Sequence, residues 1–128
     1  MKDAEHRAQV AVIKWARSMV HIRHELGLLF AIPNGGVRNA VTAMRLKHEG
    51  VLAGIPDLFL PVAKYTCLSK HLIYNGLFVE MKVKPNTVSL HQKDVHEKLW
   101  NQGYMVAVCW AAQEAIETIA EYLGIEIK

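Results

Sequence analysis

Residues 77–83 read Leu77-Phe78-Val79-Glu80-Met81-Lys82-Val83, and this stretch decides the fold. Gly76 precedes it and Pro85-Asn86 follows it, so turn residues bound it on both sides. A short apolar run between turn residues predicts a buried β-strand. Glu80 and Lys82 interrupt the run, and because they are two residues apart they lie on the same side of the predicted sheet. The strand therefore carries a carboxylate and an ammonium group into apolar surroundings.

Outward from this strand, helical and extended patterns alternate along the chain. Apolar residues at three- and four-residue steps predict helices over residues 3–25, 39–49, 89–102 and 113–123. Short apolar runs predict strands over residues 28–32, 57–62 and 104–110, the first of them buried. Residues 63–75 are predicted to form a loop with extended ends. This order predicts an α/β fold in which helices flank a mixed sheet of about four strands.

Composition limits the class of protein. The chain has 128 residues, 52% of them hydrophobic and 21% charged, which predicts one folded domain over residues 1–128 and excludes a disordered chain. Fifteen Lys and Arg against twelve Asp and Glu give a net charge of +3. This surplus allows a polyanionic partner without requiring one.

Nothing in the sequence predicts a membrane segment. No run reaches the roughly 18 to 20 continuous apolar residues that a membrane helix needs, and the first seven residues are too charged for a signal peptide. Cys67 and Cys109 are too far apart for a CxxC metal or redox motif, and we expect both to be reduced, partly buried thiols. We therefore expect a cytoplasmic protein.

Two strands carry acidic residues that could serve a metal ion. Asp57 begins one strand directly after Pro56, and Glu80 and Lys82 lie on another. Buried charges are costly without partners, and Mg²⁺ accepts hard oxygen ligands from protein, water and phosphate. The alternative is a buried salt bridge from Lys82 to either carboxylate, without chemistry. Chance alone gives about 0.4 Pro-Asp pairs and about 0.5 Glu-x-Lys triplets in a chain of this length, so the strand context strengthens the pattern.

Asp57 with Glu80-Met81-Lys82 resembles the PD-(D/E)XK signature of nucleases with the restriction-endonuclease-like fold. Further stretches are similar to the VRR-NUC family in its small standalone form, and the resemblance extends from about Glu5 to Leu123. These stretches are Glu5, Ile32-Pro33-Asn34-Gly35-Gly36, Leu46-Lys47-His48-Glu49-Gly50-Val51-Leu52-Ala53-Gly54-Ile55-Pro56-Asp57-Leu58, Ser89-Leu90-His91-Gln92 and Gly103-Tyr104. The resemblance implies a restriction-endonuclease-like sandwich with a central mixed four-stranded sheet flanked by helices.

The resemblance also implies a metal site for Mg²⁺ or Mn²⁺. Asp57 and Glu80 match the carboxylates that hold the metal, and the backbone carbonyl of Met81 matches a further ligand. Glu5 matches a glutamate of the first helix that contacts a metal directly or through water. For Glu5 there is an alternative, because a solvated carboxylate at a helix start is also favoured by the helix dipole.

Two more residues match the catalytic pattern of the family. Lys82 matches the residue that orients or deprotonates the attacking water and steadies charge on the phosphate. Gln92 matches a glutamine of the following helix that hydrogen-bonds the site. The implied reaction is metal-assisted phosphodiester hydrolysis. It requires no Ser, Cys or His nucleophile, and we find no constellation that would supply one.

Basic and glycine residues surround the predicted site. As a group they favour binding of the phosphate backbone without readout of bases, although each basic residue alone is better explained as a solvated surface charge. The candidates for DNA contacts are Asn34, Gly35, Gly36, Arg38, Arg45, Lys47, Lys84 and Lys93, with Lys98 nearby.

Two features remain outside this pattern. The pairs His21/His24 and His91/His96 lack a third soft ligand, so we expect no structural zinc. Residues 64–74 form a longer connection than the short hairpin typical of the family. That connection could contact DNA, lie at a subunit interface or do neither.

The sequence thus predicts a Mg²⁺- or Mn²⁺-dependent DNA endonuclease. By analogy with small family members that resolve four-way junctions, we expect selectivity for branched DNA, a homodimer and a role in phage or bacterial replication or repair. One alternative is a catalytically silent DNA-binding or assembly module with the same fold. Another is a small α/β domain in which Lys82 only neutralises buried carboxylates.

Overall fold

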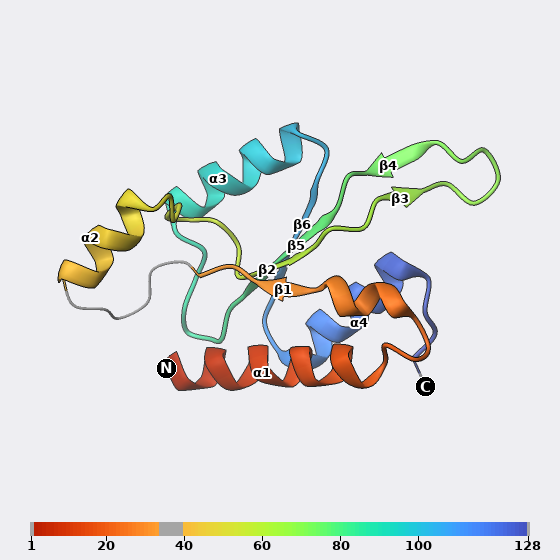
Figure 1. The fold of residues 1–128 in the computed structure, drawn as a ribbon, viewed down its shortest axis with the longest axis horizontal. Coiled ribbons are helices and arrows are strands. Elements are labelled where there is room, and N and C mark those ends of the chain that lie inside the picture. The colour runs from red at the N-terminus through yellow and green to blue at the C-terminus, as the bar shows by residue number, and fades with distance from the viewer. Residues whose placement is uncertain (1, 34–39, 128) are drawn as a thin grey trace.

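A four-stranded mixed sheet forms the centre of the molecule (Figure 1). The structure is a computed structural model that describes residues 2–33 and 40–127. The strand order is β1 (Phe30–Ala31), β2 (Leu58–Leu60), β5 (Leu77–Met81), β6 (Met105–Cys109). β1 and β2 pair antiparallel, as do β2 and β5, whereas β5 and β6 are parallel. The predicted α/β sandwich with a mixed four-stranded sheet is confirmed.

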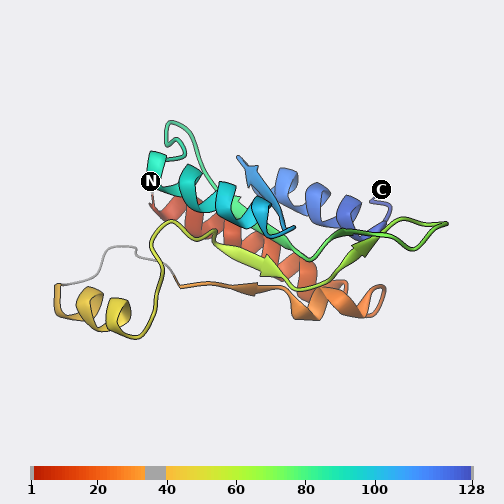
Figure 2. The ribbon, with the colours of Figure 1, turned by 90° about the horizontal axis from the view of Figure 1, so that it is seen from above.

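Helices cover both faces of this sheet. α1 (Lys2–Ser18) and α4 (Ala112–Leu123) lie side by side beneath it, whereas α3 (Leu90–Asn101) lies on the opposite face (Figures 1 and 2). The predicted helices at residues 39–49, 89–102 and 113–123 differ from the observed ones by at most one residue at each end. α2 (Ala40–His48) is the first of these, and a short 3₁₀ helix spans His24–Leu28.

Alternation along β5 separates the hydrophobic core from the polar face. Leu77, Val79 and Met81 are buried within the core formed with α1 and α4, whose side chains include Val12 and Ile119. Successive side chains on a strand point to opposite faces. The intervening residues of β5 therefore point toward the face that α3 covers.

An aromatic cluster fills part of this second face. The ring of Phe78 stacks on that of Phe59, with centroids 4.2 Å apart, and Tyr104 meets Phe78 edge to face at 5.3 Å. Edge-to-face and offset-stacked rings are the favoured aromatic geometries. Glu80 lies two residues beyond Phe78 on the same face, so one side of the site is bounded by packed aromatic rings.

Several local predictions were wrong. α1 ends at Ser18 and not near residue 25, because a turn at residues 19–22 leads into the 3₁₀ helix. β1 has two residues and both are exposed, so this edge strand is not the buried strand predicted over residues 28–32. The N-terminal end of α3 is exposed, with Leu90 83% accessible.

Two segments project from the body at opposite ends of the molecule (Figures 1 and 2). α2 has no buried residue among those described, and its apolar Val41 is 71% exposed. The connection over residues 64–74 is a hairpin of β3 (Lys64–Tyr65) and β4 (Leu72–Tyr74), as its predicted extended ends suggested. Its tip carries Leu68, which is 97% exposed, and Cys67, which is exposed and not partly buried as expected.

The loop before β2 packs tightly against α3. Gly54 has a φ of +86°, a conformation that favours glycine. A Cβ atom at this position would lie 2.9 Å from the His91 ring and 3.0 Å from a Val95 methyl group. The His91 ring Nε2 also lies 2.9 Å from the carbonyl of Ala53. These contacts fix the chain three residues before Asp57 against α3.

None of the helices in the described ranges, 2–33 and 40–127, is both long and apolar enough to cross a membrane.

Candidate active site

Glu80 is the buried centre of the candidate site. It lies in β5 on the face covered by α3, and only 2% of it is exposed. Burial and the neighbouring charge of Asp57 raise its pKa to about 9, and a side-chain hydrogen bond with Asp57 adds to this rise. A carboxyl group with such a pKa is protonated at neutral pH in the metal-free protein.

Asp57 lies beside Glu80 because of the pairing between β2 and β5. Leu58 pairs with Val79, so one step further the antiparallel register brings Asp57 next to Glu80. Asp57 Oδ2 accepts a hydrogen bond of 2.7 Å from the backbone N–H of Met81. The two carboxyl groups, 23 residues apart in sequence, thus meet at one end of the two strands.

Gln92 connects α3 to Glu80. Ser89 and Gln92 form a capping box, in which Gln92 Oε1 accepts the Ser89 backbone N–H at 2.9 Å. Since that oxygen must face the N–H donor, Nε2 is turned the other way and lies 3.4 Å from Glu80 Oε2. The helix cap therefore also sets the direction in which the Gln92 amide faces the site.

His96 was not predicted as a site residue. Its Nε2 lies 3.5 Å from Glu80 Oε1, and the residue is 8% exposed. Burial and the nearby charge of Lys82 lower the pKa of His96, so this contact is not a pair of opposite charges. The sequence contains a signal for His96. Residues four apart share one face of a helix, and Gln92, four residues before His96, is predicted to face the site.

Lys82 and Glu5 complete the surroundings. The charge of Lys82 lowers the pKa of Glu80, whereas the charge of Glu5 raises it, so both groups act on the site electrostatically. Among described residues, no ion pair within 4.0 Å joins Lys82 to Glu80. The structure therefore lacks the buried Lys82–Glu80 salt bridge that was one alternative to a metal site. Asn86 Nδ2 donates a hydrogen bond of 2.7 Å to Glu5 Oε2, which ties α1 to the loop after β5.

The donor set fits a hard divalent cation. Within the described parts of the chain no three His, Cys, Asp or Glu side chains form a preassembled ligand cluster, so a cation here depends on two carboxylates completed by other oxygens. Glu80 Oε1 is buried without a hydrogen-bond partner. Mg²⁺ is held in proteins by one or two carboxylates, with water and substrate phosphate as the remaining ligands.

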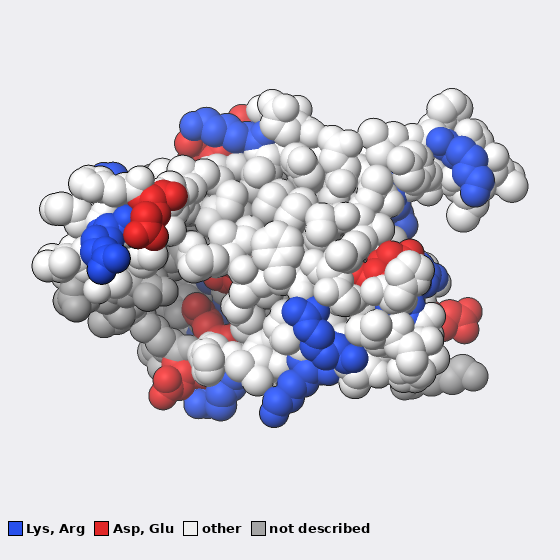
Figure 3. Space-filling view, in the orientation of Figure 1, with Lys and Arg blue, Asp and Glu red and all other residues white. Residues whose placement is uncertain are grey.

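The described candidates for DNA contacts lie on α2, in the segment after β5 and on α3. Arg45 and Lys47 are exposed on α2, and Lys84 and Lys93 are exposed near the site. Lys98 forms an exposed ion pair with Asp94 at 3.0 Å. In the view of Figure 3, Lys and Arg side chains lie on α2, α3, α1 and the hairpin without merging into one patch. Four candidates, Asn34, Gly35, Gly36 and Arg38, lie outside the described residues.

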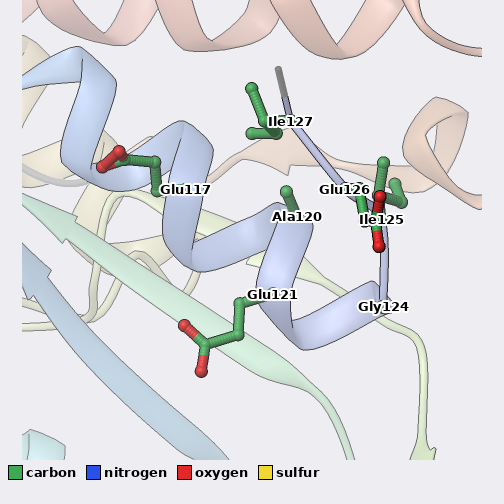
Figure 4. Close-up of a pocket in the computed structure, with 7 residues that line it drawn as sticks. All are labelled: Glu117, Ala120, Glu121, Gly124, Ile125, Glu126 and Ile127. Carbon is green, nitrogen blue, oxygen red and sulfur yellow. The ribbon is translucent and has the colours of Figure 1, made fainter.

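A pocket at the other end of α4 has the wrong charge for a nucleic acid. It holds about 420 Å³ and lies between α4 and the C-terminal segment (Figure 4). Its lining residues are Glu117, Ala120, Glu121, Gly124, Ile125, Glu126 and Ile127. Three carboxylates repel phosphate groups, so this pocket does not extend the candidate active site.

Comparison with known protein families identifies the chain. The family model described as "VRR-NUC domain" matches residues 3–113. The chain belongs to the VRR-NUC family. This is a nuclease family, and the match includes Glu5, Asp57, Glu80, Lys82 and Gln92.

A solved structure described as "VRR_NUC domain protein" has the same fold as this VRR-NUC chain. It superimposes with a TM-score of 0.73 over 95% of this chain and 89% of its own, at 24% sequence identity. No curated protein matches the sequence. The family and the restriction-endonuclease-like α/β fold expected from the sequence are thus confirmed.

Proposed function

We propose that this chain is a divalent-metal-dependent endonuclease that hydrolyses phosphodiester bonds in DNA. The observation that carries the proposal is the meeting of Asp57 and Glu80 at one end of the sheet, with a buried carboxylate oxygen that has no hydrogen-bond partner. A cation placed there would replace the proton that Glu80 retains and would compensate its buried charge. Family membership supports the same chemistry.

The roles that we propose for the residues combine this arrangement with the pattern of the family. Asp57 and Glu80 would hold Mg²⁺ or Mn²⁺, and the family pattern would add the Met81 carbonyl as a further ligand and Glu5 as a contact made directly or through water. When bound, the cation supplies Lewis acidity toward the phosphate and toward a water molecule. Lys82 orients the attacking water and balances charge on the phosphate. Gln92 keeps the Glu80 carboxylate in place through its amide.

We propose branched DNA as the substrate and a homodimer as the active form. A four-way junction has two strands to cut, and two copies related by a two-fold axis would present two sites to them. Exposed apolar side chains on and near α2, Val41, Met44 and Leu52, provide surface that a second copy could cover. Light scattering coupled to size exclusion measures the mass, and a monomeric mass at micromolar concentration contradicts the dimer. The proposed setting is replication or repair in the cytoplasm of a bacterial or phage-infected cell.

Cleavage assays test the nuclease proposal. Labelled four-way junction, nicked, flapped and linear DNA are incubated with Mg²⁺, Mn²⁺ or EDTA. We expect cutting that needs metal and that Asp57→Asn reduces by on the order of 10³-fold, since metal ligands contribute several kcal/mol to such reactions. Asp94→Asn is the matched control, because Asp94 is an exposed acid on α3.

The ranking of substrates decides whether branched DNA is preferred. Equal cutting of linear and branched DNA contradicts the proposed selectivity but not the nuclease. Salt-sensitive DNA binding without any cutting supports the silent-module alternative. If the protein neither cuts nor binds DNA, the result supports the alternative of a small α/β domain in which Lys82 only neutralises buried carboxylates.

We expect α2 to contribute phosphate contacts. Arg45 and Lys47 lie in the last turn of α2 and are exposed. Replacing both with alanine should weaken DNA binding by about tenfold, and should reduce the slope of log affinity against log salt by about 2, regardless of sequence. Fluorescence anisotropy at several salt concentrations measures both. Lys14→Ala on α1 is the control, and an unchanged slope for the double variant would remove α2 from the interface.

A further inference from the structure

Two buried polar atoms face each other at the candidate site without a hydrogen bond. They are Glu80 Oε1 and His96 Nε2, which lie 3.5 Å apart and have no other hydrogen-bond partner. The side chains of Glu80 and His96 are 10% exposed or less, so both atoms are shielded from bulk solvent. An unsatisfied buried polar group costs about 1 to 3 kcal/mol. A leucine at position 96 would leave one unsatisfied buried atom instead of two, so the histidine implies a state in which the two atoms are paired.

The geometry of α3 indicates how the Glu80 carboxylate is held when the two atoms are paired. Gln92 and His96 are four residues apart and share one face of the helix. Gln92 Nε2 reaches Glu80 Oε2, and His96 Nε2 faces Glu80 Oε1. One helix therefore presents a nitrogen to each oxygen of the same carboxylate. Each carboxylate oxygen has two lone pairs, which leaves capacity for a cation beside both nitrogens.

We propose that His96 is a positioning residue for Glu80, whose carboxylate it orients by donating a hydrogen bond from Nε2 to Oε1 when Glu80 holds the divalent cation. Gln92 fixes the other oxygen in the same way. This inference rests on the proposed function, because it assigns a role toward the metal-holding carboxylate. Hydrogen-bond partners of metal ligands typically change metal affinity or activity 10- to 100-fold when they are removed.

The test compares two substitutions of His96 in the full chain. His96→Leu removes the donor, whereas His96→Gln keeps an amide N–H near the position of Nε2. Titration calorimetry with Mn²⁺ in the absence of DNA measures metal affinity, and cleavage assays with Mn²⁺ give kcat. We expect His96→Leu to weaken Mn²⁺ binding by about tenfold or more, and His96→Gln to remain within about threefold of the wild type. His21→Leu, at an exposed histidine, is the matched control.

A measurement on the wild-type protein keeps the proposal testable if His96→Leu does not fold. Nuclear magnetic resonance of the histidine ring nitrogens reports which nitrogen carries the proton. We expect the His96 ring resonances to shift when Mg²⁺ is added, with the proton on Nε2 in the metal-bound state. Resonances of the exposed His21 should not move.

The outcomes separate the two proposals. If wild-type protein binds Mn²⁺ and cuts DNA while folded His96→Leu does so equally well, only the role of His96 is overturned. The same conclusion follows if His96→Gln folds but fails as severely as His96→Leu, or if the His96 ring does not respond to Mg²⁺. If wild-type protein neither binds metal nor cuts DNA, the proposed function fails, and the role of His96 fails with it.

Discussion

Glu80→Gln should abolish metal-dependent cleavage and at the same time stabilise the metal-free protein above neutral pH. The loss of cleavage follows from removal of a metal-holding carboxylate, and we expect a decrease on the order of 10³-fold or more. The gain in stability follows from burial, because glutamine has nearly the shape of glutamic acid and needs to take up no proton to be buried uncharged. Opposite effects on activity and on stability are expected where an active site keeps a destabilising group for its function.

The direction of the pH effect follows from the raised pKa of Glu80. The folded chain holds a proton up to about pH 9, whereas the unfolded chain loses it near the ordinary value of 4.5. The folded state therefore binds more protons between these limits, and metal-free wild-type protein loses stability as pH rises through this window. The slope for one proton is at most about 1.4 kcal/mol per pH unit. Glu80→Gln should show a flatter profile.

Thermal and urea unfolding at pH 5, 7 and 8.5 in EDTA measure this profile. Glu97→Gln is the control, because Glu97 is an exposed glutamate of α3 and its replacement should leave both slope and cleavage unchanged. Added Mg²⁺ should stabilise the wild-type protein at pH 8.5 but not Glu80→Gln. Parallel pH profiles for the wild type and Glu80→Gln would show that Glu80 ionises normally and would contradict the predicted pH dependence of stability.

Lys82→Ala should reduce cleavage by about 10² to 10⁴-fold, the range typical of a group that assists proton transfer. Metal affinity should change far less, by under about tenfold, because Lys82 contributes charge near Glu80 but no oxygen ligand. The ratio of the two effects separates a residue that acts on the attacking water from one that holds the cation.

Single-turnover cleavage rates and Mn²⁺ titrations on the same preparations measure the two quantities. Lys84→Ala is the matched control, two residues further along and exposed. Lys84 is a candidate for DNA contact, so we expect its loss to affect binding of DNA more than the rate of the bound complex. If Lys82→Ala loses metal affinity as severely as Glu80→Gln does, the assignment of Lys82 to the water is wrong.

The sequence by itself determined the features that rest on local patterns. Glu80 and Lys82 belong to one side of a strand because their spacing matches the two-residue period of a β-strand. The capping box at Ser89 and Gln92 begins a helix because the hydroxyl and amide satisfy backbone groups within four residues. Asp57 was a metal-site candidate from its strand position, and the family resemblance added Glu5 and Gln92. What failed locally was the end of α1, where helical spacing continued through a turn at residues 19–22.

Only the tertiary structure decided which distant groups meet. The bond between Asp57 and the Met81 amide depends on the register of β2 against β5, which no local pattern specifies. The position of His96 opposite Glu80 depends on how α3 lies across the sheet. From the sequence, the pair His91/His96 predicts only that no structural zinc site forms there. The raised pKa of Glu80 arises from burial and from a second carboxyl group, both of which exist only after the chain folds.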